Sequence, residues 1–266
     1  MLLALNANNT NTVFGLCSIS SDEIFTAWRV STRRDRMPDE WYALLAPLLA
    51  SGGFGPSDIE AVIIGSVVPS VTRWLVAMCR SRLGIEPTVV SADLAIGFQA
   101  DVDQPSEVGA DRIANTVAAF TRYGGPVIVV DFGTATNFDV VSAEGHFLGG
   151  AIAPGLVVSL EGLTARAARL FSVDIALPDR AIGTNTVTNI QSGVVLGHLA
   201  MVEGLVARIR AELGCDAPVI ATGGLASLFV GASPSITRDV PNLTLDGLSL
   251  IYRRLPGRSG TVLAAG

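Results

Sequence analysis

The feature that most constrains the fold of this chain is an internal repeat. Residues 2–14 (LLALNANNTNTVF) and residues 127–139 (VIVVDFGTATNFD) both show four apolar residues, then a polar run rich in Asn, Thr and Gly, then a return to apolar residues. The offset of 125 pairs Asn6 with Asp131, Asn8 with Gly133 and Asn11 with Thr136. A weaker pair, residues 62–66 and 219–223, keeps the same order. The repeat predicts two related lobes that meet near residues 115–125.

Strand-like and helix-like segments alternate along the chain, which predicts an α/β fold with mixed sheets. By β-branched content and bounding turns, we expect strands over residues 2–6, 12–19, 24–30, 61–66, 87–90, 126–131, 136–142 and 218–222. By helical spacing and end signals, we expect helices over residues 38–50, 70–83, 106–122, 155–170, 188–213 and 244–254. We expect an N-terminal lobe over 1–115, a C-terminal lobe over 116–255 and a disordered tail over 256–266.

The composition excludes several classes of protein. Hydrophobic residues make up 49% and charged residues 16%, which excludes intrinsic disorder and a coiled coil as the main class. A net charge of −6 argues against nucleic-acid binding by bulk charge. Three scattered cysteines favour a reducing compartment. The start turns polar at Asn6, too early for a signal peptide, and no apolar run is long enough for a membrane span, so we expect a cytoplasmic protein.

Three polar turns that follow predicted strands are candidate phosphate or nucleotide sites. In residues 131–136 (DFGTAT) the glycine lets backbone N–H groups approach an anion, the threonines add donors, and Asp131 could hold a cation. An ordinary hairpin turn is the alternative. Residues 6–12 match this turn without a carboxylate, and Asn8 could adopt a positive φ there. Residues 221–225 (ATGGL) would admit a flat ring such as adenine, or simply pack tightly.

Residues 107–112 (EVGADR) stand at the front of a predicted helix. Asp111 could complement the helix dipole, or it could act as a general base beside Arg112, which would steady a phosphoryl group or a carboxylate. The residues alone leave both interpretations open. His146 and His198 lie in no nucleophile motif and are expected to be solvated or packed. The charge run at residues 33–36 (RRDR) favours a solvated loop over a nucleotide contact.

Taken together, these segments resemble the type III pantothenate kinases, a family of the actin and sugar-kinase superfamily. The resemblance runs from residue 2 to about residue 254 and rests on eight motifs in order: NTNT at 9–12, SVVP at 66–69, EVGADR at 107–112, DFGTAT at 131–136, GGAIAPG at 149–155, IGTNT at 182–186, QSG at 191–193 and ATGG at 221–224. It implies two related lobes of the actin/sugar-kinase (ribonuclease H-like) fold, each a mixed sheet flanked by helices. It also implies a homodimer with an ATP cleft between the lobes.

The activity that the resemblance implies is ATP-dependent phosphorylation of pantothenate to 4'-phosphopantothenate, the first step of coenzyme A biosynthesis. Asp111 would accept the proton of the pantothenate hydroxyl. The implied substrate-binding residues are Val102, Gly109, Ala110, Asp111, Arg112 and, across the dimer, Thr186. The implied ATP-binding residues are Asn6, Ala7, Asn8, Asn9, Thr10, Asn11, Thr12, Val13, Gly133, Thr134, Gly223 and Gly224. Mg²⁺ would accompany ATP, and Asp131 would bind a monovalent cation, K⁺ or NH₄⁺.

The chain departs from the family pattern in the first turn. Asn6 stands where the family has Asp, which would organise the magnesium–phosphate group, and losing such a contact costs ~10²–10³ in rate. Asn8 stands where the family has Gly and adds a Cβ where backbone should approach phosphate. We therefore expect a kinase, with activity weakened at this turn. The alternative is a catalytically inactive homologue that binds nucleotide or pantothenate and regulates a partner. A kinase for another small hydroxylated acid, suggested by Val102 where the family often has Tyr, is weaker.

Overall fold

The computed structural model describes residues 1–167 and 170–256 and consists of two compact units. Unit 1 is Met1–Thr121 together with the chain from Leu243 onward, and unit 2 is Arg122–Asn242. The first boundary lies close to the predicted one at residues 115–116. The expected C-terminal lobe differs from unit 2 at its end, because the chain from Leu243 returns to unit 1. Residues 257–266 of the predicted tail lie outside the described residues.

Unit 1 contains a five-stranded mixed sheet in the order β3-β2-β1-β4-β5. Its strands are β1 (Leu2–Ala7), β2 (Asn11–Cys17), β3 (Ile24–Ser31), β4 (Ala61–Ser66) and β5 (Thr88–Val89). The first three form antiparallel hairpins, whereas β1 pairs with β4, and β4 with β5, in parallel. Every residue of β1 is buried, as a central strand covered on both faces requires, which explains its unbroken apolar start.

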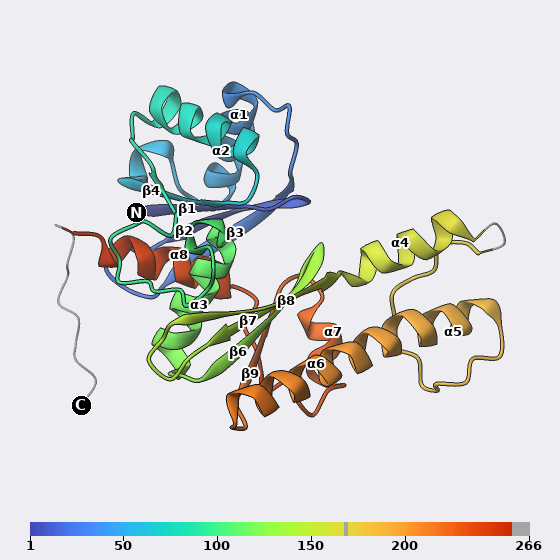
Figure 1. The fold of residues 1–266 in the computed structure, drawn as a ribbon. Helices are drawn as coiled ribbons and strands as arrows, with labels where there is room; N and C mark the ends of the chain where they lie inside the picture. The colour runs from blue at the N-terminus through green and yellow to red at the C-terminus, as the bar shows by residue number, and fades with distance from the viewer. Residues whose placement is uncertain (168–169, 257–266) are drawn as a thin grey trace. The chain divides into compact units, whose positions relative to one another are not determined.

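Helices cover both faces of this sheet (Figure 1). They are α1 (Pro38–Ser51), α2 (Pro69–Met78, continued by a π-helical turn, Cys79–Leu83), α3 (Ala110–Tyr123) and α8 (Leu243–Arg254), with short 3₁₀ turns at Pro56–Asp58 and Pro105–Glu107. Alternate residues of β1 face the two layers, as the pleat of a strand dictates. One face packs α1 and α2 through Leu3, Leu5, Trp41, Leu45, Val71 and Leu75. The other packs α3 and α8 through Leu2, Ala4, Ile113, Val117, Leu248 and Ile251.

Unit 2 contains a second five-stranded sheet in the order β10-β9-β6-β7-β8. Its strands are β6 (Val127–Phe132), β7 (Ala135–Val141), β8 (Phe147–Pro154), β9 (Val219–Thr222) and β10 (Arg238–Asp239). Its helices are α4 (Leu156–Arg166), α5 (Thr186–Gln191), a π-helical segment (Ser192–Leu196), α6 (Gly197–Leu213) and α7 (Ala226–Val230). Apolar side chains of β6, β9, α6 and α7 form its core, among them Val130, Val202, Val219 and Phe229.

The helical stretch Thr186–Leu213 runs without a break through α5 and α6, so it is longer than the apolar runs visible in the sequence. Among the described residues it is the one helix whose length and hydropathy would suffice to cross a membrane. A single such helix is weak support for a span, because core helices meet the same criteria.

The two sheets repeat one topology, which confirms the predicted internal repeat. Read from the far edge, β8-β7-β6-β9-β10 corresponds strand by strand to β3-β2-β1-β4-β5, and each pair keeps its parallel or antiparallel sense. The weaker sequence pair is confirmed too, since it falls on β4 and β9. Strand β8, with two glycines, and the two-residue β10 escaped the sequence analysis, as did the single short helix α7.

One detail of the predicted repeat is wrong. Ala7 pairs with Thr12 across the first hairpin, whereas Phe132 pairs with Thr136 across the second. The first turn is therefore one residue longer, and Thr12, rather than Asn11, is the counterpart of Thr136.

A close approach of α8 to α3 gives a test of the packing in unit 1. A Cβ at Gly247 would lie 2.0 Å from the carbonyl oxygen of Ala114, so Gly247→Ala must separate the helices. We expect a loss of about 1–3 kcal/mol, seen as a lower melting temperature. Gly204→Ala is the matched control, because Gly204 lies inside α6 with open space around it. This control should be neutral or stabilising by up to about 1 kcal/mol. Equal melting temperatures for the two variants would contradict the described packing.

Candidate functional site

The carboxyl ends of β1 and β4 lie side by side and bring two predicted motifs together. The parallel register pairs Asn6 with Gly65 and Ala7 with Ser66. Beyond the strands, the backbone N–H of Val67 donates to the carbonyl oxygen of Ala7, with N and O 3.1 Å apart. The first candidate phosphate turn and the SVVP segment therefore share one edge of the sheet in unit 1.

The first turn closes tightly without a left-handed residue. The N–H of Asn8 donates to the carbonyl oxygen of Asn11 over 2.9 Å, and no described non-glycine residue has a positive φ. Asn8 thus does not adopt the positive φ that asparagine would tolerate, because the longer turn closes without it. Asn9 and Thr10 at the tip are exposed, Val13 is half-buried, and Thr12 is buried with its hydroxyl 2.8 Å from that of Thr32.

Two side-chain oxygens in this turn have no hydrogen-bond partner among the described residues. They are Oδ1 of Asn6 and Oδ1 of Asn8, both buried. Asn6 is only 6% exposed, although it ends a strand whose backbone is fully paired. A buried amide oxygen without a donor costs about 1–3 kcal/mol. The two oxygens therefore fit a donor or a cation that binds at the turn, and a hydrated divalent metal supplies both.

Asp111 lies in the first turn of α3, next to the same edge of the sheet. Its Oδ1 accepts from the backbone N–H of Arg112 over 2.8 Å. A Cβ at Gly109 would lie 2.7 Å from that Oδ1 and 3.3 Å from Cγ1 of Val67. Only glycine leaves room for the carboxylate here, and Val67 connects it to the end of β1. Asp111, Gly109 and the first turn are thus neighbours within unit 1.

The pKa of Asp111 is raised above its ordinary value. Burial of the carboxyl is the main cause, and the N–H and the charge of Arg112 oppose it. A raised pKa is what a general base working near neutral pH requires, and it is not expected for a carboxylate that only complements a helix dipole. The role of Asp111 as a general base stays a prediction.

The other predicted substrate residues are distributed over both units. Ala110 is buried at the start of α3, and Arg112 is half-buried one turn into it. Val102 is half-buried in the irregular segment before the 3₁₀ turn. Thr186 belongs to unit 2, so its predicted contact with the substrate of Asp111 stays a prediction.

Unit 2 repeats the arrangement at the carboxyl ends of β6 and β9. Asp131 pairs with Thr222 in parallel register. Gly223 has φ +93°, and a Cβ on it would lie 2.5 Å from Oδ1 of Asp131 and 2.7 Å from the backbone of Phe132. The ATGG turn and the DFGTAT turn are therefore in direct contact, and glycine at 223 is needed both for its backbone angle and for that approach.

The DFGTAT turn is a three-residue hairpin closed by the N–H of Gly133, which donates to the carbonyl oxygen of Ala135 over 3.0 Å. The N–H of Gly155 donates to the carbonyl oxygen of Thr134 over the same distance, and a Cβ at Gly155 would meet that oxygen at 2.3 Å. Gly133, Thr134 and Gly224 are exposed, so both turns present backbone to a ligand. The sequence analysis identified the GGAIAPG motif that ends at Gly155, but it did not predict the contact of Gly155 with Thr134.

Thr136 does not offer its hydroxyl to a phosphate as the sequence suggested. Its Oγ1 lies 3.0 Å from Nε2 of His198, and both side chains are buried. The His198 ring stacks on Phe229 at 5.6 Å between centroids, and burial lowers its pKa. His198 is therefore packed, which is one of the two outcomes, solvated or packed, that the sequence analysis expected. It links α6 to the base of the second turn.

Cation binding at Asp131 would rely on oxygen donors. No group of three or more His, Cys, Asp or Glu side chains that could hold a metal is found within residues 1–167 and 170–256. The Asp131 carboxylate faces backbone of Gly133 and Gly223, and carbonyl oxygens complete the coordination of hard cations. The donor set fits an oxygen-ligated cation and does not fit a zinc-type site.

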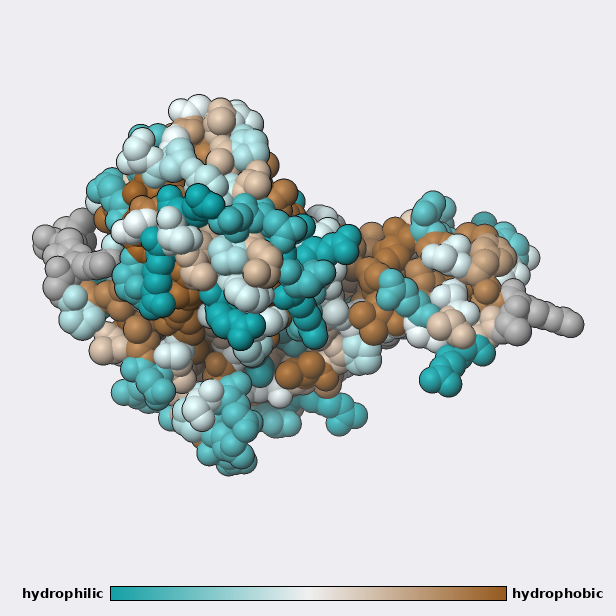
Figure 2. All heavy atoms as spheres, turned by 90° about the horizontal axis from the view of Figure 1, so that it is seen from above, coloured by the Kyte–Doolittle hydropathy of each residue, from teal (hydrophilic) through white to brown (hydrophobic). Residues whose placement is uncertain are grey.

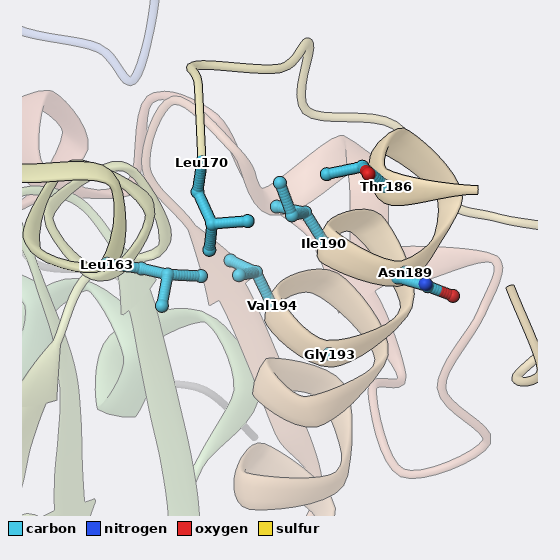
Figure 3. A pocket seen from close by; sticks show the side chains of 7 residues that line it. All are labelled: Leu163, Leu170, Thr186, Asn189, Ile190, Gly193 and Val194. Carbon is cyan, nitrogen blue, oxygen red and sulfur yellow. The ribbon is translucent and has the colours of Figure 1, made fainter. Parts of the chain in front are cut away.

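Thr186 lines an apolar pocket of about 450 Å³ between α4 and the start of the long helix (Figure 3). Leu163, Ile190 and Val194 point into it, and Thr186 lies at its rim next to Asn189. Thr186 is the first residue of α5, behind Asn185, whose Oδ1 accepts from the N–H of Thr188 over 3.0 Å. The apolar lining was not foreseen, because it comes from α4 and from residues spaced along one face of the helix.

Comparisons with known proteins show the family of the chain. The family model described as "Type III pantothenate kinase" matches residues 2–208. A protein named type III pantothenate kinase from Roseiflexus sp. (strain RS-1) is 49% identical over 253 residues, covering 95% of this chain and 98% of the relative. A protein of the same name from Thermomicrobium roseum is 48% identical over 255 residues, covering 96% of this chain and 98% of the relative.

Solved structures show the same fold. The crystal structure from Sinorhizobium meliloti described as "a putative 2-dehydro-3-deoxygalactonokinase protein" superposes with a TM-score of 0.61 over 98% of this chain and 99% of that one, at 12% identity. Two repeated sheets flanked by helices are the α/β architecture of the sugar kinases, as expected. The family model matches residues 2–208 and the relatives cover 95–96% of the chain, so the chain belongs to the type III pantothenate kinase family.

Proposed function

We propose that this chain transfers the γ-phosphoryl group of ATP to pantothenate, giving 4'-phosphopantothenate in the first step of coenzyme A biosynthesis. The observation that carries the proposal is the partly buried Asp111, with its raised pKa, beside the turn that follows β1. Phosphoryl transfer depends on positioning and on neutralising charge rather than on covalent help from the protein. A polar turn and a carboxylate at one edge of a sheet supply the first requirement.

Asp111 acts as the proton acceptor in this proposal. Its Oδ1 already accepts from the N–H of Arg112, so Oδ2 faces the pantothenate hydroxyl. As the hydroxyl oxygen bonds to the γ-phosphorus, its proton moves to Oδ2 and the bond to the ADP oxygen breaks. Gly109, Ala110, Arg112 and Val102 contact pantothenate, and Thr186 contacts it from a second copy of the chain.

The cofactors follow from the donors at each turn. Residues 6–13 hold the ATP phosphates, and Asn6 and Asn8, whose Oδ1 atoms are buried without a hydrogen-bond partner, are the residues that would hold a hydrated Mg²⁺. Magnesium, when bound, supplies neutralising charge on the triphosphate. Asp131 binds the monovalent cation, K⁺ or NH₄⁺, next to Gly133, Thr134 and the adenosine turn at Gly223 and Gly224. Enzymes of coenzyme A synthesis use cytoplasmic substrates, and we propose the cytoplasm for this one.

The regulatory alternative receives no support from the comparisons, since the family model and the relatives described above carry the kinase name. Calorimetry with ATP and with pantothenate separately distinguishes the functions. A kinase binds both ligands, whereas a nucleotide-sensing regulator binds ATP alone. A kinase for another hydroxylated acid binds ATP but prefers a different acceptor.

The proposed base gives a prediction in which activity and stability change in opposite directions. Burial raises the pKa of Asp111, so its charged form destabilises the folded state at neutral pH. Asp111→Asn should therefore abolish turnover and raise the melting temperature at pH 7. The difference in melting temperature between Asp111→Asn and the wild type should become smaller as pH falls, because protonation of Asp111 then removes the buried charge from the wild type as well. Turnover is read by coupled ADP release and stability by thermal melts from pH 7 to pH 5.

Glu107→Gln is the control for Asp111→Asn. It removes an exposed carboxylate from the 3₁₀ turn just before α3. Its turnover and its melting temperature should both equal those of the wild type within error. Loss of stability in Asp111→Asn, or turnover close to that of wild type, would contradict the assigned role.

Restoring the family residues in the first turn tests the weakened site. Asn6→Asp combined with Asn8→Gly should raise kcat ~10²–10³-fold in a steady-state assay with ATP, pantothenate, Mg²⁺ and K⁺. Without nucleotide the double variant should melt lower than wild type, because it buries a carboxylate. Asn11→Asp adds the same charge elsewhere in the turn and should give no gain. A kcat unchanged by the double variant would mean that this turn is not rate-limiting.

The homodimer is proposed from exposed apolar side chains in unit 2. In the part of the chain that the structure describes, nine of the twelve large hydrophobic side chains that are exposed lie between Leu148 and Val187, with Ile152 and Ile182 at 68% and 83%. Figure 2 shows hydrophobic side chains on the part of unit 2 that contains α4. Contiguous apolar surface of this kind marks an interface. A second copy of the chain is the partner that also brings Thr186 to a substrate site.

A charge on α4 tests that interface. Val158→Arg should convert the dimer to monomer in sedimentation velocity and lower pantothenate turnover, because an unpaired charge would be buried between copies. Val89→Arg is the matched control, since Val89 in β5 is 38% exposed against 40% for Val158 and lies outside the apolar surface. A dimer that persists in Val158→Arg, or a monomeric wild type, would contradict the proposed assembly.

A further inference from the structure

The loop after β3 is fastened to the first phosphate turn. Because β2 pairs with β3 up to Asn11 and Ser31, the loop begins beside the turn. The backbone N–H of Thr32 donates to the carbonyl oxygen of Thr10 over 2.9 Å. Nη2 of Arg34 donates to Oδ1 of Asn9 over 3.0 Å. The charge run that the sequence analysis assigned to a solvated loop therefore contains a residue that contacts the candidate ATP site.

Arg34 keeps most of its hydrogen-bonding capacity for a ligand. A guanidinium has five N–H donors, and the bond to Asn9 uses one. Within the described residues Arg34 contacts no carboxylate, and its side chain is exposed. Arg36 is occupied differently, because it donates to the carbonyl oxygen of Ser31 and stacks over Trp41 at 4.7 Å. Arg34 is thus a cation held at the turn with donors to spare.

The turn itself lacks positive charge. Residues 6–13 are uncharged, the chain contains no lysine, and Asn6 is a neutral amide that attracts a metal ion far less than a carboxylate would. A triphosphate bound there needs cationic partners, and the planar fork of arginine matches two phosphate oxygens at once. Arg34 is the guanidinium that a side-chain hydrogen bond ties to this turn.

We propose that Arg34, oriented by Asn9, binds a phosphate group of the nucleotide and adds positive charge at a turn where the neutral amide of Asn6 attracts a metal ion less strongly than a carboxylate would. The inference rests on the proposed function, because it assumes that residues 6–13 hold the ATP phosphates. It makes Arg34 a phosphate-binding residue and Asn9 a positioning residue.

Titration calorimetry on the purified full-length protein tests the role of Arg34. Arg34→Gln should weaken ATP binding about ten-fold, because a charge-assisted hydrogen bond is lost. The loss should be absent for adenosine, which has no phosphate, and KM for pantothenate should not change. ATP binding by Arg34→Gln should also depend less on salt, since the lost contact is between charges.

Arg33→Gln is the matched control, because Arg33 is the adjacent exposed arginine and its side chain makes no hydrogen bond or ion pair within the described residues. It should change ATP affinity less than two-fold. Asn9→Ala should weaken ATP binding by an intermediate factor, since the charge remains but its orientation is lost. Melting temperatures of all three variants should match wild type, because the side chains are exposed.

The outcomes separate the two proposals. ATP affinity in Arg34→Gln equal to that in Arg33→Gln, with the wild type binding ATP, overturns the role of Arg34 and leaves the kinase proposal intact. An equal loss for adenosine also overturns it, because the residue would then not act through phosphate. A wild type that binds no ATP overturns both proposals.

Discussion

Parallel pairing of a lobe's first strand with its fourth is the constraint on which the rest of this structure depends. Neighbouring parallel strands end at the same edge, so the turns that follow them must meet there. In unit 1 this brings Val67 to Ala7, and Gly109, just before α3, lies close to both Val67 and the carboxylate of Asp111. In unit 2 it brings Asp131 to Gly223. Each of these two pairs of turns is thus a product of sheet topology, because its polar residues lie at the ends of neighbouring parallel strands.

Most of the fold could be predicted because local and global signals agree. Runs such as LLAL and VIVV are buried on both faces of a central strand, and a repeat that long constrains the topology. Strand β8 was missed because Gly149 and Gly150 interrupt its pattern with positive φ angles. Pairing with β7 overrides that weak propensity. The return of α8 to unit 1 was missed because it depends on Gly247 approaching α3, a tertiary contact without a local signal.

The two hairpin turns could be predicted from the sequence, and their contacts less so. Glycine, amides and hydroxyls after an apolar strand predict a turn at residues 6–12 and 131–136, and phosphate binding there stays a prediction. Turn chemistry does not reveal that Thr136 turns its hydroxyl inward to His198, 62 residues further on. Nor does it reveal that Asn9 holds Arg34, because that bond depends on the pairing of β2 with β3. Contacts between side chains that are far apart in the sequence cannot be predicted from motifs alone.

Asn6, Asn8 and Arg34 together determine how much positive charge the first turn can offer to a phosphate. A carboxylate at position 6, in a strand end only 6% exposed, would be costly until a cation arrived. The neutral amide of Asn6 avoids most of that burial cost, but it lacks the negative charge with which a carboxylate would hold magnesium. Arg34 is exposed, so it brings positive charge to the turn without a burial penalty. In this proposal the turn neutralises phosphate partly through the guanidinium of Arg34, which is held by its hydrogen bond to Asn9 rather than by coordination to a metal ion.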